Sequence, residues 1–417
     1  MGYALQGISH YIFMGGFMNE KKLSFLSGSL LWFGAAISIT EILTGALLAP
    51  LGLRLGVAAI VSGHFIGCIL LYLAGLIGAK SKRSAMESVE LSFGRFGSVF
   101  FSFLNILQLV GWTAIMILSG ANALGSVAND KLGLAGNMLW CVLIGLLIVI
   151  WILAGLQNIG RLNIVAVGAL FILTAILGVI VFKGGVLLKT NEIMSFGLAL
   201  ELSIAMPVSW LPLISDYTKN TDRPVQFTFV STMSYFLGSC SMYVIGLGAA
   251  IFTGSSDVVQ ILMNAGLGIA AMLIVILSTV TTTFLDVYSA SESMLNIRPK
   301  WNGKATGIAV CIIGTLIAMY TPIEQYENFL TLIGSVFVPM AAILITDYFI
   351  LKKRDDVKKL NFLNACLWIV GFIIYRFFLN IDTVLGSTVP VVLIMMCLCI
   401  LTNKMGITNN RNINKQK

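Results

Sequence analysis

Residues 30–53, LLWFGAAISITEILTGALLAPLGL, form an apolar stretch that carries one acidic residue, Glu41, near its middle. About 20 apolar residues in a helix cross the hydrocarbon core of a bilayer. A charged side chain at that depth costs roughly 2.5–3.5 kcal/mol on insertion scales, so it indicates a function or a buried partner. A second carboxylate, Asp286, lies inside the apolar stretch 270–295, and both stretches also hold small and hydroxyl residues. Together they predict a polar pocket within the membrane core.

The composition of the whole chain agrees with that interpretation. Hydrophobic residues make up 58% of the 417 positions and charged residues 11%, and the mean hydropathy is +0.95. Soluble domains carry about 25% charged residues. The sequence therefore predicts an all-α polytopic membrane protein with twelve transmembrane helices. The expected spans are 30–53, 57–79, 97–123, 138–157, 162–183, 194–216, 227–253, 263–296, 305–321, 328–351, 361–379 and 385–402.

The net charge of +8 follows the expected topology and does not indicate a nucleic-acid partner. With the amino terminus in the cytoplasm, all but five of the 26 Lys and Arg residues fall on the cytoplasmic side. This positive-inside bias predicts an even number of spans and two cytoplasmic termini, in a bacterial inner or plasma membrane. The exceptions are Arg54, Lys131, Lys183, Lys189 and Arg376.

The chain is expected to form one membrane domain. We assign residues 1–29 to a cytoplasmic segment without a signal peptide, 30–402 to a single transporter domain and 403–417 to a disordered cytoplasmic tail. The seven cysteines are scattered and follow no metal-binding or disulfide pattern, so they are expected to be reduced.

Two of the expected spans contain helix-breaking residues at corresponding positions. The first span has Gly34 and Ser38 close to Glu41, and the sixth has Pro207 and Pro212. Proline removes a backbone donor and kinks a helix. Transporters built from inverted repeats bind substrate where two such spans are broken near the midplane. The first and sixth spans are five apart, as a five-plus-five repeat requires; the alternative is that glycine and proline are simply common in membrane helices.

The third span has a polar stripe. Asn105, Gln108 and Trp112 share one helix face by their i, i+3, i+7 spacing. An indole stacks on a planar ring, and a carboxamide offers a donor beside an acceptor, which suits a heteroaromatic ligand. The alternative is that the polar residues form hydrogen bonds between helices.

The eighth span has a second stripe, formed by Thr279, Thr282, Thr283 and Asp286. Adjacent hydroxyl groups that face the free carbonyls of a broken first helix would supply the hard oxygen ligands that Na⁺ prefers. The alternative is that the threonines bond back to their own helix. The carboxylates Glu41, Glu201 and Asp286 permit a proton as the coupling ion instead. Glu201 is the nearest of the three to a membrane end, and the alternative for it is a solvated residue of the vestibule. His64 is interpreted as a packed or hydrogen-bonded residue rather than a proton relay.

Several motifs resemble the nucleobase:cation symporter-1 family. The tenth span runs from Tyr326-Glu-Asn-Phe-Leu-Thr-Leu-Ile-Gly-Ser to Pro339 and continues to Asp347-Tyr-Phe. Gln-Leu-Val-Gly-Trp at 108–112 and Asp216-Tyr217 at the end of span six are also similar to that family. The opening at 32–45 is most similar to its cytosine-permease branch, and closest to hydroxymethylpyrimidine transporters.

This resemblance implies a leucine-transporter fold with inverted repeats at about 30–190 and 191–351 and two extra helices at 361–402. It also implies cation-coupled uptake of a nucleobase-like ring by alternating access. Trp112 matches the family's stacking tryptophan, and Gln108 lies near its amide partner. The residues that match the family's sodium site are the backbone of Gly34 and Ile37, the carbonyl near Ser278, and the hydroxyls of Thr281 and Thr282.

The chain departs from the family in its pocket residues. Thr283 and Asp286 stand where many relatives have asparagine. An aromatic residue often lines the broken sixth helix of relatives where Met206 and Pro207 stand here, and Trp210 is the nearest candidate for that role. A carboxyl group can pair in two-pronged fashion with an amine beside a ring nitrogen, so Glu41 or Asp286 is expected to bind an aminopyrimidine edge. The predicted substrate-binding residues are Trp112, Gln108, Glu41, Ser38, Asp286, Thr283 and Trp210.

The favoured function is therefore the import of a pyrimidine, hydroxymethylpyrimidine above all, coupled to Na⁺ or H⁺. A cytosine or purine permease and an amino-acid symporter of the same fold are the alternatives. An intramembrane enzyme is disfavoured because the His-Glu-x-x-His motif is absent. A channel is disfavoured because broken helices favour alternating access, and a sensor because the sequence shows no attached signalling domain. The expected partners are a small heterocycle and membrane lipid, with no cofactor, no nucleic acid and no obligate protein partner.

Overall fold

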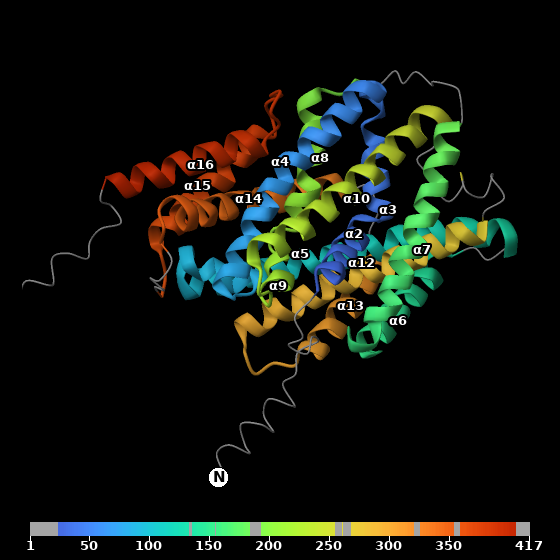
Figure 1. Cartoon of the computed structure of the whole chain (residues 1–417), viewed down its shortest axis with the longest axis horizontal. Helices are drawn as coiled ribbons and strands as arrows, with labels where there is room; N and C mark the ends of the chain where they lie inside the picture. The colour runs from blue at the N-terminus through green and yellow to red at the C-terminus, as the bar shows by residue number, and fades with distance from the viewer. Residues whose placement is uncertain are drawn as a thin grey trace, which may run out of the picture.

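The computed structural model describes residues 24–132, 136–154, 156–183, 193–254, 261, 268–320, 326–353 and 359–405. Most of the amino-terminal segment and of the carboxyl-terminal tail thus lies outside the described residues. Within the described ranges the chain is helical and contains no strand (Figure 1). The helices are α2 (Phe25–Ala36), α3 (Ile39–Leu47), α4 (Gly52–Ser81), α5 (Ala85–Leu132), α6 (Asn137–Ala154), α7 (Leu156–Lys183), α8 (Phe196–Ser209), α9 (Ile214–Thr218), α10 (Pro224–Thr253), α12 (Gly268–Ile297), α13 (Gly303–Tyr320), α14 (Tyr326–Ile345), α15 (Phe362–Phe378) and α16 (Thr388–Lys404).

The helices fall where the apolar stretches predict them. Among the described residues, six helices are long and apolar enough to cross a membrane, and a seventh span arises if the bent pair α2–α3 is taken as one. Five further apolar helices are shorter, between 10 and 17 residues. The all-helical membrane architecture is confirmed, whereas the count of twelve crossings and the inverted repeat stay predictions.

The first span is broken, as expected. α2 ends at Ala36, α3 begins at Ile39, and the two helices meet at an angle of 52°. Ile37 donates its N–H back to Gly34 and Phe33, which closes the end of α2. Ser38 then adopts an extended conformation and its hydroxyl accepts the backbone N–H of Glu41 at 3.3 Å, a side-chain cap that starts a new helix.

The sixth span is broken as well. α8 ends at Ser209, residues 210–213 form a turn, and α9 begins at Ile214. The turn leaves carbonyl groups without helical partners, and the third span supplies donors to them. Asn105 Nδ2 donates to the Pro212 carbonyl at 3.1 Å, and Gln108 Nε2 lies 3.5 Å from the Ser209 carbonyl. The amides of the third-span stripe thus stabilise the broken backbone.

Glycines allow the broken helices to pack closely on their neighbours. A side chain at Gly45 of α3 would collide with the backbone of Tyr243 in α10, and one at Gly246 would collide with the Ile42 carbonyl. Such contacts of small residues are how membrane helices approach each other. α15 and α16 pack together and on α14 at one end of the molecule, away from α6 and α7 (Figure 1).

Candidate functional site

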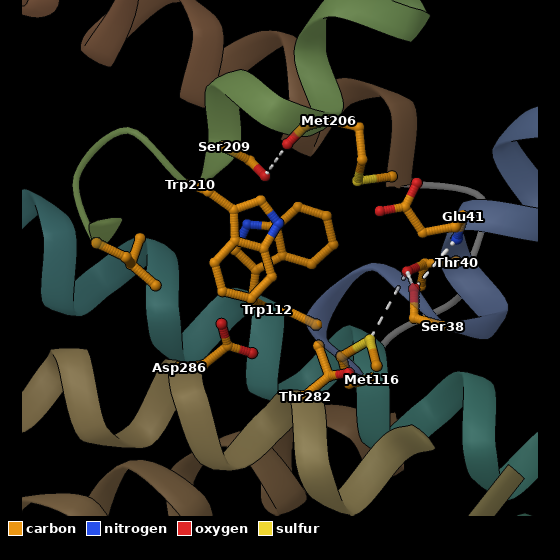
Figure 2. Close-up of a pocket in the computed structure, with 12 residues that line it drawn as sticks. Ser38, Thr40, Glu41, Trp112, Met116, Met206, Ser209, Trp210, Thr282 and Asp286 are labelled. Carbon is orange, nitrogen blue, oxygen red and sulfur yellow. Dashed lines mark hydrogen bonds between the residues drawn. The ribbon is translucent and has the colours of Figure 1, made fainter. Parts of the chain in front are cut away.

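A small buried cavity lies between the two broken spans. Its volume is about 20 Å³, which is room for about one water molecule and too little for a pyrimidine ring in this conformation. The first, third, sixth and eighth spans all contribute to its wall (Figure 2). The lining residues are Ala35, Ser38, Thr40, Glu41, Trp112, Met116, Met206, Ser209, Trp210, Leu213, Thr282 and Asp286.

The structure brings together most of the predicted substrate residues. Five of the seven line this cavity, namely Ser38, Glu41, Trp112, Trp210 and Asp286. Their convergence requires contacts between segments that are more than 240 positions apart in the chain, which helix packing alone supplies. A cavity that separate spans share, with two carboxylates in a largely apolar wall, is therefore present.

Gln108 and Thr283 lie behind the cavity wall. Gln108 bonds to Asn105 Oδ1 at 2.9 Å and approaches the backbone of Ser209, while its own Oε1 has no hydrogen-bond partner. Thr283 is fully buried, and its hydroxyl is also without a partner. Neither side chain is among those that line the cavity in this conformation.

Asp286 is the residue of the cavity wall whose carboxyl group is best placed to bind a polar ligand. Its side chain is 4% solvent-exposed, and among the described residues it forms no hydrogen bond or ion pair. In Figure 2 its carboxylate points toward the indole rings of Trp112 and Trp210. A buried carboxyl group without a donor is costly, so the cavity has an unfilled demand for a polar ligand at this position.

The two tryptophans of the cavity are held by other aromatic rings. Trp112 meets Phe329 edge-on, with ring centroids 5.6 Å apart. Trp210 meets Trp32 at 5.5 Å and Tyr235 at 6.1 Å, again with the rings steeply inclined. Edge-to-face contacts of this kind fix the orientation of a ring. A stacking surface for a planar ligand is thus fixed in place by its neighbours.

Glu41, unlike Asp286, has partners from the seventh span. Tyr235 donates its hydroxyl to Oε1 at 2.9 Å, and Ser239 Oγ lies 2.6 Å from Oε2. Sequence reasoning missed both residues, although they are four positions apart in α10 and so share one helix face. Nothing in the sequence indicates which neighbouring helix that face meets.

The predicted sodium residues are partly engaged with their own helices. Thr281 Oγ1 donates to the Leu277 carbonyl at 2.7 Å and to the Ser278 carbonyl at 3.2 Å, which is the back-bonding alternative. Thr282 lines the cavity, and its hydroxyl has no partner. The Gly34 carbonyl accepts the N–H of Ile37 at 3.2 Å. Thr282 is therefore the member of the set best placed to bind an ion from the cavity.

Glu201 is buried elsewhere, against the extra helices. Its Oε1 accepts the hydroxyls of Tyr375 at 2.6 Å and Thr388 at 2.7 Å, and its Oε2 accepts the backbone N–H groups of Ser387 and Thr388 at 2.7 and 2.8 Å. It borders a separate cavity of about 500 Å³. Glu201 therefore binds the sixth span to the start of α16 and is not part of the small central cavity.

Comparison with known proteins places this geometry in a family. Residues 19–403 match the family described as permeases for cytosine/purines, uracil, thiamine and allantoin. Cytosine permease of Escherichia coli (strain K12) is 26% identical over 307 residues, which cover 72% of this chain and 71% of that protein. The fold is similar to that of Mhp1, a nucleobase-cation-symport-1 transporter in a closed conformation with bromovinylhydantoin bound, with a TM-score of 0.78, 19% identity and coverage of 94% and 97%. A Na⁺-coupled sialic acid symporter gives a TM-score of 0.67, with 12% identity and coverage of 92% and 90%.

Proposed function

The chain belongs to the family of permeases for cytosine/purines, uracil, thiamine and allantoin, and from that premise we propose that it imports a pyrimidine by cation-coupled alternating access. Hydroxymethylpyrimidine, a thiamine precursor, is the substrate that we favour. Members of this family are transporters rather than enzymes, and the apolar helices make this chain a multi-pass membrane protein. We further propose that both termini lie in the cytoplasm.

The observation that carries this proposal is the carboxylate of Asp286, which forms no hydrogen bond with the described residues and points toward the indole rings of Trp112 and Trp210 (Figure 2). An aminopyrimidine presents an amine donor beside a ring-nitrogen acceptor. A protonated carboxyl group accepts from the amine and donates to the ring nitrogen, whereas an ionised carboxylate forms both hydrogen bonds only with a protonated ring. The indole supplies stacking for the ring, which is worth about 1–3 kcal/mol per base. The Glu41 carboxyl group already has hydrogen bonds with the hydroxyls of Tyr235 and Ser239. We therefore assign binding of the substrate's amine edge to Asp286 and a different role to Glu41.

Cytosine is a second candidate substrate, and the similarity to cytosine permease supports it as well as it supports hydroxymethylpyrimidine. It has the same amine beside a ring nitrogen, so Asp286 and Trp112 would bind it in the same way. The two differ in the groups around the rest of the ring, which would meet Ser38, Thr282 or Met206 when the cavity opens. Binding of a pyrimidine panel separates them.

The coupling ion is a further part of the proposal. Sodium would bind at Thr282 with the backbone of Gly34 and Ile37, and with Ser278 and Thr281 after their hydrogen bonds rearrange. The similarity of the fold to cation-coupled symporters supports ion coupling in general. The free hydroxyl of Thr282 is the local observation that supports sodium.

Transport is tested with the purified chain in proteoliposomes. Vesicles loaded with unlabelled pyrimidine should accelerate the entry of the labelled compound, because a carrier exchanges its substrate and neither a channel nor a sensor does so. Binding of hydroxymethylpyrimidine, cytosine, uracil and a purine is then measured with and without sodium. Absence of exchange for every compound would overturn the proposed function, and an affinity unaffected by sodium would remove the sodium site.

A further inference from the structure

A chain of three buried polar side chains leads from the cavity wall into the helix bundle. Ser239 Oγ of α10 lies 2.6 Å from Glu41 Oε2 and 2.6 Å from His64 Nε2 of α4. His64 Nδ1 lies 2.9 Å from the backbone carbonyl of Ile60. His64 and Ser239 are completely buried, and Glu41 is 1% exposed. Of the three, Glu41 alone lines the cavity.

The acceptors of these hydrogen bonds fix how many protons the three side chains Glu41, Ser239 and His64 carry together. The Ile60 carbonyl is an acceptor only, so His64 must carry a proton on Nδ1. The two contacts of Ser239 each need a hydrogen atom, and its hydroxyl has one to give. The other comes either from a protonated Glu41 or from a second ring proton on His64.

Both arrangements therefore contain one proton more than an ionised Glu41 beside a neutral His64. In the first, Glu41 donates to Ser239, which donates to His64; in the second, Ser239 donates to Glu41 and an imidazolium donates to Ser239. Each is electrically neutral as a whole. Removal of the extra proton would leave two lone pairs facing each other at 2.6 Å and a net negative charge in the membrane core, which is costly.

Among the described residues, no neighbouring basic group balances the negative charge that loss of this proton would leave. The titratable groups that lie near Glu41, Ser239 and His64 are Cys68 on α4, and Tyr235, Cys240 and Tyr243 on α10. Across the cavity, α12 contributes Asp286, and α5 and α8 contribute Trp112, Met116 and Met206, none of which is basic. Among the described residues no Lys or Arg forms an ion pair with Glu41.

We propose that Glu41, Ser239 and His64 form a proton-binding site that couples transport to the proton gradient. This inference rests on the proposed function and takes a proton, in place of the sodium ion proposed at Thr282, as the coupling ion. Glu41 receives the proton from the cavity when it is open to the outside, and Ser239 shares it with His64 in the closed state. Opening toward the cytoplasm returns the proton through Glu41. No bond other than those to the proton is made or broken, and the cluster alternates between neutral and singly negative.

The test uses the full chain in proteoliposomes without sodium on either side, with a pH-sensitive dye trapped inside. One proton per substrate converts a gradient of one pH unit, acid outside, into about a tenfold accumulation. Wild-type protein should reach that accumulation and acidify the lumen as labelled pyrimidine enters. Ser239→Ala should exchange labelled pyrimidine within about threefold of wild type, since the residue lies outside the cavity wall, yet lose accumulation and acidification.

Ser241→Ala is the matched control. It is the same substitution on the same helix, but Ser241 is exposed and its hydroxyl donates to the Leu237 carbonyl of its own helix, so accumulation should remain at the wild-type level. A wild-type protein that exchanges pyrimidine but neither accumulates it nor moves protons would overturn the proton site and leave the proposed function standing. Exchange that appears only after sodium is added would overturn the proton site alone, and absence of exchange both with and without sodium would overturn both.

A spectroscopic measurement covers the case in which Ser239→Ala does not fold. The chain has only two histidines, so histidine-selective ¹⁵N labelling of wild-type protein gives few signals, and His10→Gln identifies that of His64. A buried His64 with a proton on Nδ1, either alone or together with Nε2, is the expected result. A neutral ring protonated on Nε2 alone would contradict the hydrogen-bond count and with it the proton site.

Discussion

Asp286 and Glu201 are both carboxylates buried within the membrane-spanning helices, and their surroundings are opposite. Glu201 accepts four hydrogen bonds, two from hydroxyls and two from the backbone at the start of α16. Asp286 accepts none from the described residues. The start of a helix also favours a negative charge through its exposed N–H groups and its dipole.

The difference shows how to separate a structural carboxylate from a functional one in a membrane protein. A carboxylate with a full set of donors is stable without a ligand, whereas one without donors remains costly until a ligand arrives. Glu41 is intermediate, because it has two donors and one of them also contacts His64. The number of hydrogen-bond donors around each carboxylate therefore indicates a structural role for Glu201, a functional role for Asp286 and an intermediate position for Glu41.

The largest effect is expected at Asp286. Asp286→Ala removes both hydrogen bonds proposed to the substrate edge, which at about 1.5 kcal/mol or more each should weaken binding about 100-fold. Glu201→Gln is the control, since it changes a carboxylate of equal burial outside the cavity and should leave the affinity unchanged. The measurement is equilibrium binding of labelled pyrimidine to purified protein. Equal losses in the two variants would show that burial rather than position decides the effect.

A smaller loss is expected at Trp112. Trp112→Ala removes the stacking surface, worth about 2 kcal/mol or roughly 30-fold in affinity, while Trp112→Phe should retain most of it. Trp301→Ala is the control, because this indole is exposed and packs on Arg298 instead. The same binding assay reports all three. Full affinity in Trp112→Ala would place the ring of the substrate elsewhere in the cavity.

These expectations also show how far the sequence alone leads. Both helix breaks could be predicted, because glycine, proline and a capping serine act locally on the backbone. The two carboxylates and Trp112 stood out because polar or amphipathic residues in apolar stretches are rare. All of these signals depend on neighbours within a few positions of the chain.

The remaining features depend on which helices meet, and local patterns do not specify this. Asn105 and Gln108 share a face with Trp112, yet they bond to the broken sixth span rather than line the cavity. Ser239 is 198 positions from Glu41, and Thr388 is 187 from Glu201. Pairs at such separations follow from the packing of whole helices, so a single sequence shows the residues but not their partners.

The smallest effect on transport is expected at Glu201, where the loss should appear in stability instead. Glu201→Gln places an amide nitrogen against donors on Tyr375, Ser387 or Thr388, which should lower the free energy of unfolding by about 1–3 kcal/mol. Asp382→Asn is the control, since it makes the same change at an exposed position beside the same 500 Å³ cavity. Thermal unfolding in detergent measures the difference. A Glu201→Gln protein with wild-type stability but weakened pyrimidine binding would reverse the assignment, because it would place Glu201 on the substrate path and leave the start of α16 without need of its charge.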